Sequence, residues 1–338
     1  MTLIKPANPV YILGPSLYLP PKVVTNDELI TWMNASFRPS WIEKRTGINT
    51  RHWVTPEVAC SDLATYAANN LFELKKIDPC RIGVLNLATT SGDYIAPPTA
   101  PLVQHKLGLN EVGSYDLSAA CAGFISGLLT SQGLLNSIDK DILLIASEIR
   151  SKFLNHQEFQ TSVLFGDGAA AVMLSKQSNG ADFKLIAGNM LTDGSVADII
   201  SIPTGGSKNP THLNLDGIHT LKMRQGAELF VKALEGMYKS SEMLLQSLNL
   251  TINDIDYIVP HQANLHMIEG LVRKFNFPME RVVQTVKKWG NTSGASVGMA
   301  LHELKFSGNF DLKAGNKILL ISAGGGGLAA NAVLEALN

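Results

Sequence analysis

Short apolar runs alternate with helix-like segments along this chain, a pattern typical of α/β proteins. A helix-like stretch at 61–76, which Ser61 is expected to cap, ends at Asp78-Pro79 and leads into an apolar run. A Gly-Asp-Gly turn at 166–168 precedes a further run. The first half of the chain is therefore predicted to contain strands at 10–19, 82–88, 142–146 and 169–174.

The second half of the chain repeats this order of elements. A helix predicted at 226–248 leads through Asn253-Asp254 into a strand at 255–259, just as the helix at 61–76 leads into its own strand. Later runs also match, 317–323 with 141–147 and 329–337 with 169–174. We therefore predict an α/β fold built from two duplicated halves.

The halves are placed at residues 1–178 and 179–338, with the linker near 177–182. A long surface segment rich in glycine, proline and asparagine is expected at 192–213. A duplicated fold places equivalent loops beside each other at its pseudo-twofold axis. An active site is expected there.

Composition and charge narrow the class of protein. The 338 residues are 45% hydrophobic, enough to fill a sizeable core, and 28 basic against 29 acidic residues leave a formal net charge of -1. This balance provides no electrostatic footprint for nucleic acid or an anionic membrane. The three cysteines, Cys60, Cys80 and Cys121, include no C-x-x-C pair. A reducing compartment, the cytoplasm, is therefore favoured over a disulfide framework.

One stretch tests the membrane hypothesis. Residues 117–138 carry no charged side chain and are long enough to span a bilayer. However, seven of them are serine, threonine, glutamine or asparagine, which lowers the hydrophobicity of the stretch. A helix buried on all sides is the preferred interpretation. The apolar run at 10–19 is interrupted by glycine and proline and is interpreted as a strand rather than a signal peptide.

Cys121 is the candidate nucleophile. It lies among small residues between a strand-like and a helix-like run, where helix N–H groups can stabilise a thiolate and a substrate can approach closely. The competing interpretation is structural, because free cysteine is among the most buried residue types.

Two polar side chains are predicted to join Cys121. His261 stands at the end of the strand at 255–259, and Asn291 opens a small-residue helix that is the repeat counterpart of the Cys121 helix. A histidine supplies general-base or hydrogen-bonding capacity, and an amide adds an uncharged donor for a developing oxyanion. We expect these three residues to converge on one site.

Three competing motifs are weaker. Gly294 to Gly298 matches the G-x-S-x-G nucleophile elbow, but no hydrophobic strand runs into it. The glycines at 324–327 fit a dinucleotide fingerprint, yet too few residues follow them, so a loop that presents N–H groups to a reacting oxygen is preferred. His261 and His266 lack metal-ligand spacing and accompanying carboxylates, so no metal site is predicted.

Taken together, these motifs resemble the β-ketoacyl-acyl-carrier-protein synthase III family of the thiolase superfamily. The resemblance runs from the first strand to the last, with its motifs in the family order. They are Trp41-Ile42, Arg45 to Ile48, Ala119 to Phe124, Phe165 to Ala169, Val259 to Asn264, Gly290 to Ser293 and the terminal glycine loop.

The resemblance implies a fold, an assembly and a reaction. The fold would be a thiolase-like five-layered α/β/α/β/α sandwich, present as a homodimer. Cys121 would take an acyl group from acyl-CoA and condense it with a malonyl thioester, carried by acyl carrier protein, with loss of carbon dioxide. Fatty acid or related secondary-metabolite biosynthesis is implied, with no cofactor beyond the two substrates. The N–H groups of Cys121 and Gly325 would hold the oxyanion, while His261 and Asn291 would hydrogen-bond the malonyl thioester carbonyl.

The candidate substrate-binding residues follow the family pattern less closely. Trp41 and Arg45, four residues apart, can share a helical face that offers a stacking plane and a phosphate fork. A half-buried tryptophan beside a solvated arginine is the simpler alternative. By resemblance, Asn264 and Phe230 are also expected to bind substrate. The chain departs from the family at places that recognise CoA or the carrier protein and at the tunnel wall, with His266, Phe159, Val231 and Ala323 there. Tunnel depth is expected to depend on Leu154, Phe159, Met190 and Leu213.

Three alternative functions remain open, the first of them on the same fold. An acyltransferase or thioesterase would acylate Cys121 but ignore malonyl donors. A non-catalytic partner subunit of a ketosynthase heterodimer would have no need of the complete Cys121, His261 and Asn291 set. A dehydrogenase would have to bind a nicotinamide cofactor.

Overall fold

The computed structural model describes residues 2–215 and 217–337. The strands are β1 (Leu3–Ile4), β2 (Val10–Tyr18), β3 (Val23–Thr25), β4 (Thr50–His52), β5 (Ile82–Ala88), β6 (Gly113–Leu117), β7 (Asp141–Glu148), β8 (Gly168–Ser175), β9 (Phe183–Thr192), β10 (Ile200–Ser201), β11 (Lys222–Met223), β12 (Tyr257–Pro260), β13 (Lys317–Gly324) and β14 (Leu328–Ala336). The α-helices are α1 (Asn26–Met33), α2 (Pro39–Thr46), α3 (Cys60–Lys75), α4 (Ala100–Lys106), α5 (Gly123–Leu135), α6 (Phe159–Ser162), α7 (Gly226–Ser247), α8 (Leu265–Phe275), α9 (Val286–Trp289) and α10 (Ser296–Phe306).

One mixed sheet runs through the molecule. Its strand order is β12-β13-β14-β9-β2-β8-β7-β5-β6, with β1 paired to β9. The two halves of the chain meet where β2 pairs antiparallel with β9, Val10–Ile12 against Phe183–Leu185. Outward from this seam, β8, β7 and β5 follow on one side, and β14, β13 and β12 on the other.

The pairing directions on the two sides agree. The β5–β7 and β12–β13 pairs are parallel, whereas β7–β8 and β13–β14 are antiparallel. The parallel β5–β6 pair also has a counterpart, because Val282 makes a parallel bridge to Ile258 of β12. The predicted duplication is confirmed by this topology. The boundary at 178/179 falls in the turn between β8 and β9 and stays a prediction.

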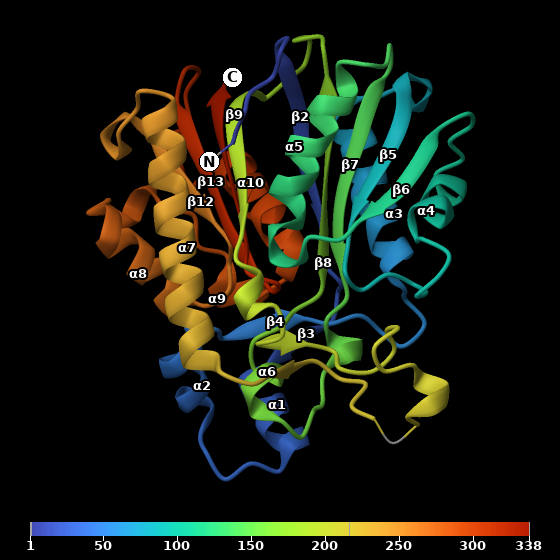
Figure 1. Cartoon of the computed structure of the whole chain (residues 1–338), viewed down its shortest axis with the longest axis vertical. Helices are drawn as coiled ribbons and strands as arrows, with labels where there is room; N and C mark the ends of the chain where they lie inside the picture. Colours follow the sequence, from blue (N-terminus) through green and yellow to red (C-terminus); the bar gives the residue numbers. More distant parts are fainter. Residues whose placement is uncertain (1, 216, 338) are drawn as a thin grey trace.

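Helices form three layers around the sheet. Figure 1 shows α7 and α8 on one flank, α3 and α4 on the opposite flank, and α5 and α10 between the two halves. The central core joins Phe124 and Leu128 of α5 to Met299 and Leu301 of α10 and to residues from strands of both halves. Separate clusters bury α3 and α7 on the outer faces. The predicted five-layered α/β/α/β/α sandwich is confirmed.

The element boundaries differ slightly from the predicted ones. Ser61 does not cap α3: Ala59 is the N-cap, and its N–H donates to the Asp62 carboxylate at 2.8 Å. Ser61 instead bonds through its N–H and hydroxyl to Asp93, in the loop after β5. Such a side chain can equally serve a nearby loop, which a sequence pattern does not distinguish from a cap. The buried segment predicted within 117–138 is the thirteen-residue helix α5.

A smaller subdomain lies below the carboxyl ends of the strands. Here α1, α2 and the antiparallel pair of β3 and β4 pack around Val24, Leu29, Ile42 and Trp53. Figure 1 shows it beneath the main sheet. Because β5, β6 and β7 are mutually parallel, as are β12 and β13, the residues that follow them gather at this edge.

Candidate active site

Cys121 lies in a tight turn between β6 and α5. The turn is a short 3₁₀ segment, Ala120–Ala122, and Ala120 has a φ of 46°, a left-handed conformation that is uncommon for residues other than glycine. The counterpart turn before α10, Ser293–Ala295, has the same feature, with a φ of 51° at Ser293. Cys121 therefore precedes the first turn of its helix rather than lying within it.

The two turns approach each other closely. A Cβ at Gly294 would come within 2.9 Å of the Ala120 carbonyl oxygen, so only glycine fits there without a shift. The Cys121 sulfur lies 3.6 Å from the Ser293 hydroxyl oxygen. The duplication thus places the starts of both central helices at one point, as predicted.

The thiol of Cys121 is held mainly in its protonated form. Burial raises its pKa above the ordinary value, while the Ser293 hydroxyl, the charge of Arg150 and the Gly325 N–H act in the opposite direction. A Cβ at Gly324 would lie 2.8 Å from the Cys121 nitrogen, so glycine keeps that N–H accessible. To act as a nucleophile, this thiol would need a base, and two backbone N–H groups are available beside it.

His261 directly follows β12 and is only 3% exposed. Its Nδ1 lies 2.7 Å from the hydroxyl oxygen of Ser296, the first residue of α10. When that hydroxyl donates to Nδ1, the proton resides on Nε2, which becomes a donor toward the cavity. Burial lowers the pKa of His261 to about 4, so the ring is uncharged at neutral pH.

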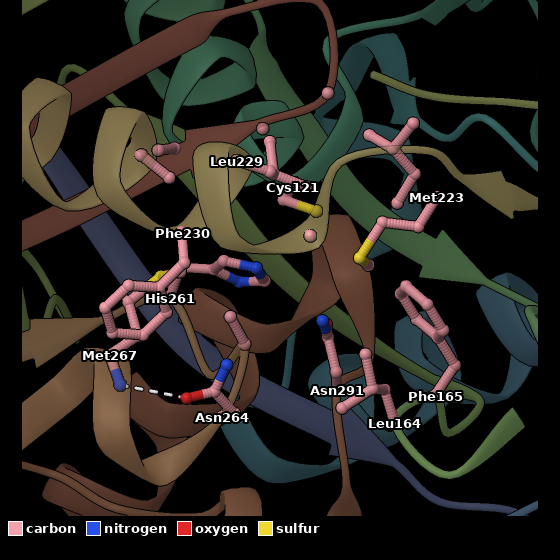
Figure 2. Close-up of a pocket in the computed structure, with 17 residues that line it drawn as sticks. Cys121, Leu164, Phe165, Met223, Leu229, Phe230, His261, Asn264, Met267 and Asn291 are labelled. Atoms are coloured by element: carbon pink, nitrogen blue, oxygen red, sulfur yellow. Dashed lines mark hydrogen bonds between the residues drawn. The ribbon is translucent and has the colours of Figure 1, made fainter. Parts of the chain in front are cut away.

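Asn291 is oriented by a backbone group. Its Oδ1 accepts a hydrogen bond of 2.8 Å from the Ser293 N–H, which leaves the Nδ2 donors for the cavity. Figure 2 shows the Cys121 sulfur, the His261 ring and the Asn291 nitrogen all directed into the same space. The predicted convergence of these residues is thus visible in the geometry, while their catalytic roles stay a prediction.

Two cavities meet at Cys121. One extends toward α7 and contains His261 and Asn291. Its remaining lining is largely apolar and comprises Leu164, Phe165, Ile200, Met223, Gly226, Leu229, Phe230, Ala233, Ala263, Asn264, Met267, Ala323, Gly324 and Gly325. The other contains polar groups from both halves together with apolar walls, and its lining comprises Thr90, Ala120, Arg150, Phe165, Ile200, Ser201, Ile202, Leu221, Ser293 and Gly325.

The expected substrate residues fall into two groups. Phe230 and Asn264 line the first cavity, although the Asn264 side chain also caps α8 by accepting the Met267 N–H at 2.9 Å. Trp41 and Arg45 lie outside both cavities on α2, with the guanidinium carbon 4.5 Å from the Trp41 ring centroid. Their role in binding a donor stays a prediction.

The structure shows what surrounds the residues that depart from the family pattern. Phe159 packs edge-on against Trp41, with ring centroids 5.4 Å apart. His266 bonds to the Lys44 carbonyl at 2.9 Å and so ties α8 to α2, whereas Val231 is 58% exposed on α7. Ala323 lines the first cavity. Most of the sites expected to carry a basic residue therefore hold an aromatic or apolar side chain.

The side chains expected to set the tunnel depth do not line it. Leu154 is buried in the subdomain core, while Phe159, Met190 and Leu213 are exposed among the described residues. The walls come instead from Phe165, Ile200, Ile202, Leu221 and Met223. The reason is that β10 and β11 pair and bring residues of a long connection back over Cys121, which no local pattern indicated.

Sequence reasoning missed three polar residues of the site. Ser293 and Ser296 contact Cys121 and His261, and Arg150 reaches Ser293 from the end of β7. Ser296 is the serine of the elbow-like motif, but it is buried and holds the histidine rather than facing substrate. Arg150 had one available signal, its position two residues after a strand that ends at the active edge.

The lowered pKa of His261 makes stability depend on pH. Below about pH 6.5, His261 becomes protonated in the unfolded chain but stays uncharged in the folded chain until about pH 4. The free energy of unfolding therefore decreases as the pH falls through this window. At pH 5 the loss is about 2 kcal/mol. Urea unfolding of wild type and His261→Gln at pH 7.5 and pH 5 measures it. The variant should lose about 2 kcal/mol less than wild type, and an equal loss in both proteins would contradict the assignment.

The chain offers neither a membrane-crossing helix nor a ligand cluster for a metal within the residues that the structure describes. Every described helix is too short or too polar to cross a bilayer. In the same ranges, 2–215 and 217–337, no three histidine, cysteine or acidic side chains gather where they could hold a metal ion. The glycine loop at 324–327 joins two antiparallel strands rather than opening a helix, as expected for a loop that supplies N–H groups.

Comparison with known proteins relates the chain to one protein family. Residues 115–194 match the family profile described as 3-oxoacyl-[acyl-carrier-protein (ACP)] synthase III, and residues 245–336 match the profile of its C-terminal region. A β-ketoacyl-[acyl-carrier-protein] synthase III from Fusobacterium nucleatum is 37% identical over 317 residues, covering 93% of this chain and 95% of that protein.

Two further relatives extend the comparison. A 3-oxopimeloyl-[acyl-carrier-protein] synthase from Rhodothermus marinus is 36% identical over 335 residues, covering 97% of this chain and 94% of that protein. The crystal structure of 3-oxoacyl-(acyl carrier protein) synthase III from Pseudomonas aeruginosa superimposes with a TM-score of 0.89 at 30% identity, covering 98% of this chain and 99% of that one. Sequence and structure thus agree over nearly the whole length.

Proposed function

The chain belongs to the 3-oxoacyl-[acyl-carrier-protein] synthase III family, and on that premise we propose that it carries out decarboxylative condensation of an acyl and a malonyl thioester. The observation that carries this proposal is the convergence of Cys121, His261 and Asn291 on one cavity. The product would be a β-ketoacyl thioester for fatty acid or related secondary-metabolite biosynthesis.

The first step transfers the acyl group to the enzyme. The Cys121 sulfur attacks the carbonyl carbon of acyl-CoA. Its proton passes to Nε2 of the uncharged His261, which can accept it in the tautomer whose Nδ1–H donates to the Ser296 hydroxyl, and then to the departing CoA sulfur. The tetrahedral oxyanion accepts hydrogen bonds from the N–H groups of Cys121 and Gly325. A thioester on Cys121 and free CoA result.

The second step forms the carbon–carbon bond. A malonyl thioester enters the cavity, and its thioester carbonyl oxygen accepts hydrogen bonds from Nε2 of His261 and Nδ2 of Asn291. Loss of carbon dioxide leaves an enolate whose negative oxygen these donors stabilise. The enolate carbon attacks the acyl carbonyl, and the Cys121 thiolate departs and takes up a proton from solvent. Two uncharged donors suit this step, because neither has to give up a proton to the enolate.

The alternatives predict different use of the malonyl donor. An acyltransferase or thioesterase needs only the first step, and a silent partner subunit needs neither. The Asn291 amide lines the first cavity, and its Oδ1 already accepts the Ser293 N–H, so its Nδ2 donors face the cavity. This arrangement serves enolate stabilisation, which simple acyl transfer does not require.

Intact-mass analysis of the protein with a panel of acyl-CoAs tests the proposal. We expect an added acyl mass on Cys121 and, once malonyl-acyl carrier protein is supplied, release of carbon dioxide together with a β-ketoacyl product. A wild-type protein that is never acylated would overturn the proposal. Acylation without carbon dioxide release would favour the simple acyltransferase.

Partners and assembly follow from the same premise. We propose acyl carrier protein as carrier of the malonyl group and a homodimer as the active form, in the cytoplasm. The loop after β5 supports self-association, because Tyr94 is 62% and Ile95 86% exposed. Light scattering measures the subunit number directly. The relatives' names specify different products, a β-ketoacyl group in general and a 3-oxopimeloyl group in one case.

A further inference from the structure

The second cavity beside Cys121 contains a buried arginine. Arg150 follows β7 by two residues, is only 6% exposed, and lines the cavity together with Cys121, Thr90 and Ser293. Phe165, Ile200, Ile202 and Leu221 form the apolar walls. The space next to the nucleophile therefore combines a surface for methylene groups with one guanidinium.

The guanidinium is only partly satisfied by the protein. Its Nη2 donates to the Ser293 hydroxyl at 3.0 Å and to Thr90, and lies 3.0 Å from a Glu148 oxygen. The buried Nε has no hydrogen-bond partner among the described residues. Every hydrogen bond from the guanidinium to the described residues thus comes from Nη2, one of its three nitrogens.

Glu148 does not use the remaining donors. Its two carboxylate oxygens already accept from Thr90 and Ser91 as well as from Nη2 of Arg150. Burying a charged group with unpaired donors is costly, and it is especially costly against apolar walls that would suit an unsubstituted acyl chain. An acceptor that enters with the substrate would remove this cost.

We propose that the acyl group carried by Cys121 ends in a carboxylate, so that the donor substrate is the CoA thioester of a short dicarboxylic acid. This inference rests on the proposed acyl transfer. The methylene groups lie along the apolar walls, and the terminal carboxylate accepts N–H groups of Arg150, the side chain whose planar fork best matches a carboxylate. The reaction at the thioester is unchanged.

The geometry also limits chain length. Ser293 links the two ends of the pocket, with its hydroxyl oxygen 3.6 Å from the Cys121 sulfur and 3.0 Å from Nη2 of Arg150. The guanidinium is therefore within two hydrogen-bond lengths of the nucleophile. Only a short chain fits between these two points without folding back on itself.

Single-turnover acylation of Cys121, followed by intact mass, tests the proposal. Succinyl-, glutaryl- and adipyl-CoA are compared with butyryl-, valeryl- and hexanoyl-CoA, the uncharged chains of equal carbon number. We expect wild type to react with at least one dicarboxylic thioester roughly 10- to 100-fold faster than with its uncharged counterpart. Equal or faster reaction of the uncharged chains would overturn the inference, and this comparison requires no variant.

Arg150→Leu separates substrate recognition from a structural role. We expect the variant to lose roughly 10- to 100-fold in rate with the preferred dicarboxylic thioester while retaining or gaining rate with the uncharged chain. Equal slowing with both would show that Arg150 only holds the end of β7 to the turn at Ser293 or tunes the thiol. Arg81→Leu, which removes a partly exposed guanidinium just before the opposite end of β5, is the matched control and should keep the wild-type preference.

The same panel distinguishes the two proposals. If uncharged acyl-CoAs acylate Cys121 and dicarboxylic ones do not, the condensing function stands and the carboxylate inference falls. If no thioester acylates Cys121, the proposed function itself fails.

Discussion

Cys121→Ala is expected to abolish both the acyl-enzyme and the condensation product. Among the described residues that line both cavities, Cys121 is the only one with a nucleophilic side chain, so the overall rate should fall by at least roughly 10³-fold. Intact mass with the preferred acyl-CoA should show no adduct, and product formation should be at background.

The other cysteines provide controls for this variant. Cys80 is exposed, and Cys80→Ser should be acylated like wild type. Cys60 is buried, and burial raises the pKa of its thiol to about 12, which leaves it inert as a nucleophile. An adduct that persists in Cys121→Ala would place the nucleophile elsewhere and contradict the site.

Asn291→Asp is expected to separate the two half-reactions. An aspartate oxygen can still accept the Ser293 N–H, so the local structure is kept, but the Nδ2 donor that faces the cavity is lost. Condensation with a malonyl thioester should fall by roughly 10²- to 10³-fold, the usual cost of removing one donor to a developing oxyanion. Acylation of Cys121 should stay within a few-fold of wild type.

Two measurements check this separation, namely single-turnover acylation and carbon dioxide release from the malonyl donor. Asn291→Ala is the companion variant, since it removes the acceptor for Ser293 as well. If Asn291→Asp slows acylation as much as condensation, Asn291 positions the Cys121 and Ser293 turns rather than the malonyl thioester, and the proposed second step would need another donor.

Much of the fold could be predicted from local patterns. The strand β5 coincides with its predicted range, and β2, β7 and β14 differ by one or two residues, because a run of apolar residues bounded by turn residues specifies a buried strand directly. The repeat between the halves was also visible, since equivalent elements face equivalent environments. Capping was less predictable, as the interaction of Ser61 with Asp93 shows.

The candidate site was predictable to the extent that each residue stands at the end of its own element. Cys121, His261 and Asn291 all follow strand-like runs or open helices, and a duplicated α/β fold gathers such positions at one edge. Their orientation was not predictable. The bond from the Ser293 N–H that turns Asn291 and the bond from Ser296 that holds His261 depend on a second 3₁₀ turn seated against the first.

By itself, the sequence determined the order of strands and helices and the duplication, and it singled out Cys121 as the candidate nucleophile, because periodicity, turn residues and helix starts are properties of neighbouring residues. Only the tertiary structure decided what surrounds Cys121. The contact between Arg150 and Ser293 joins residues 143 positions apart, and the β10–β11 pair folds Ile200 over the cavity. Such contacts depend on how strand ends from the two halves pack together, and no pattern of neighbouring residues specifies that packing. The position of the Arg150 guanidinium beside Cys121 is therefore a property of the folded protein.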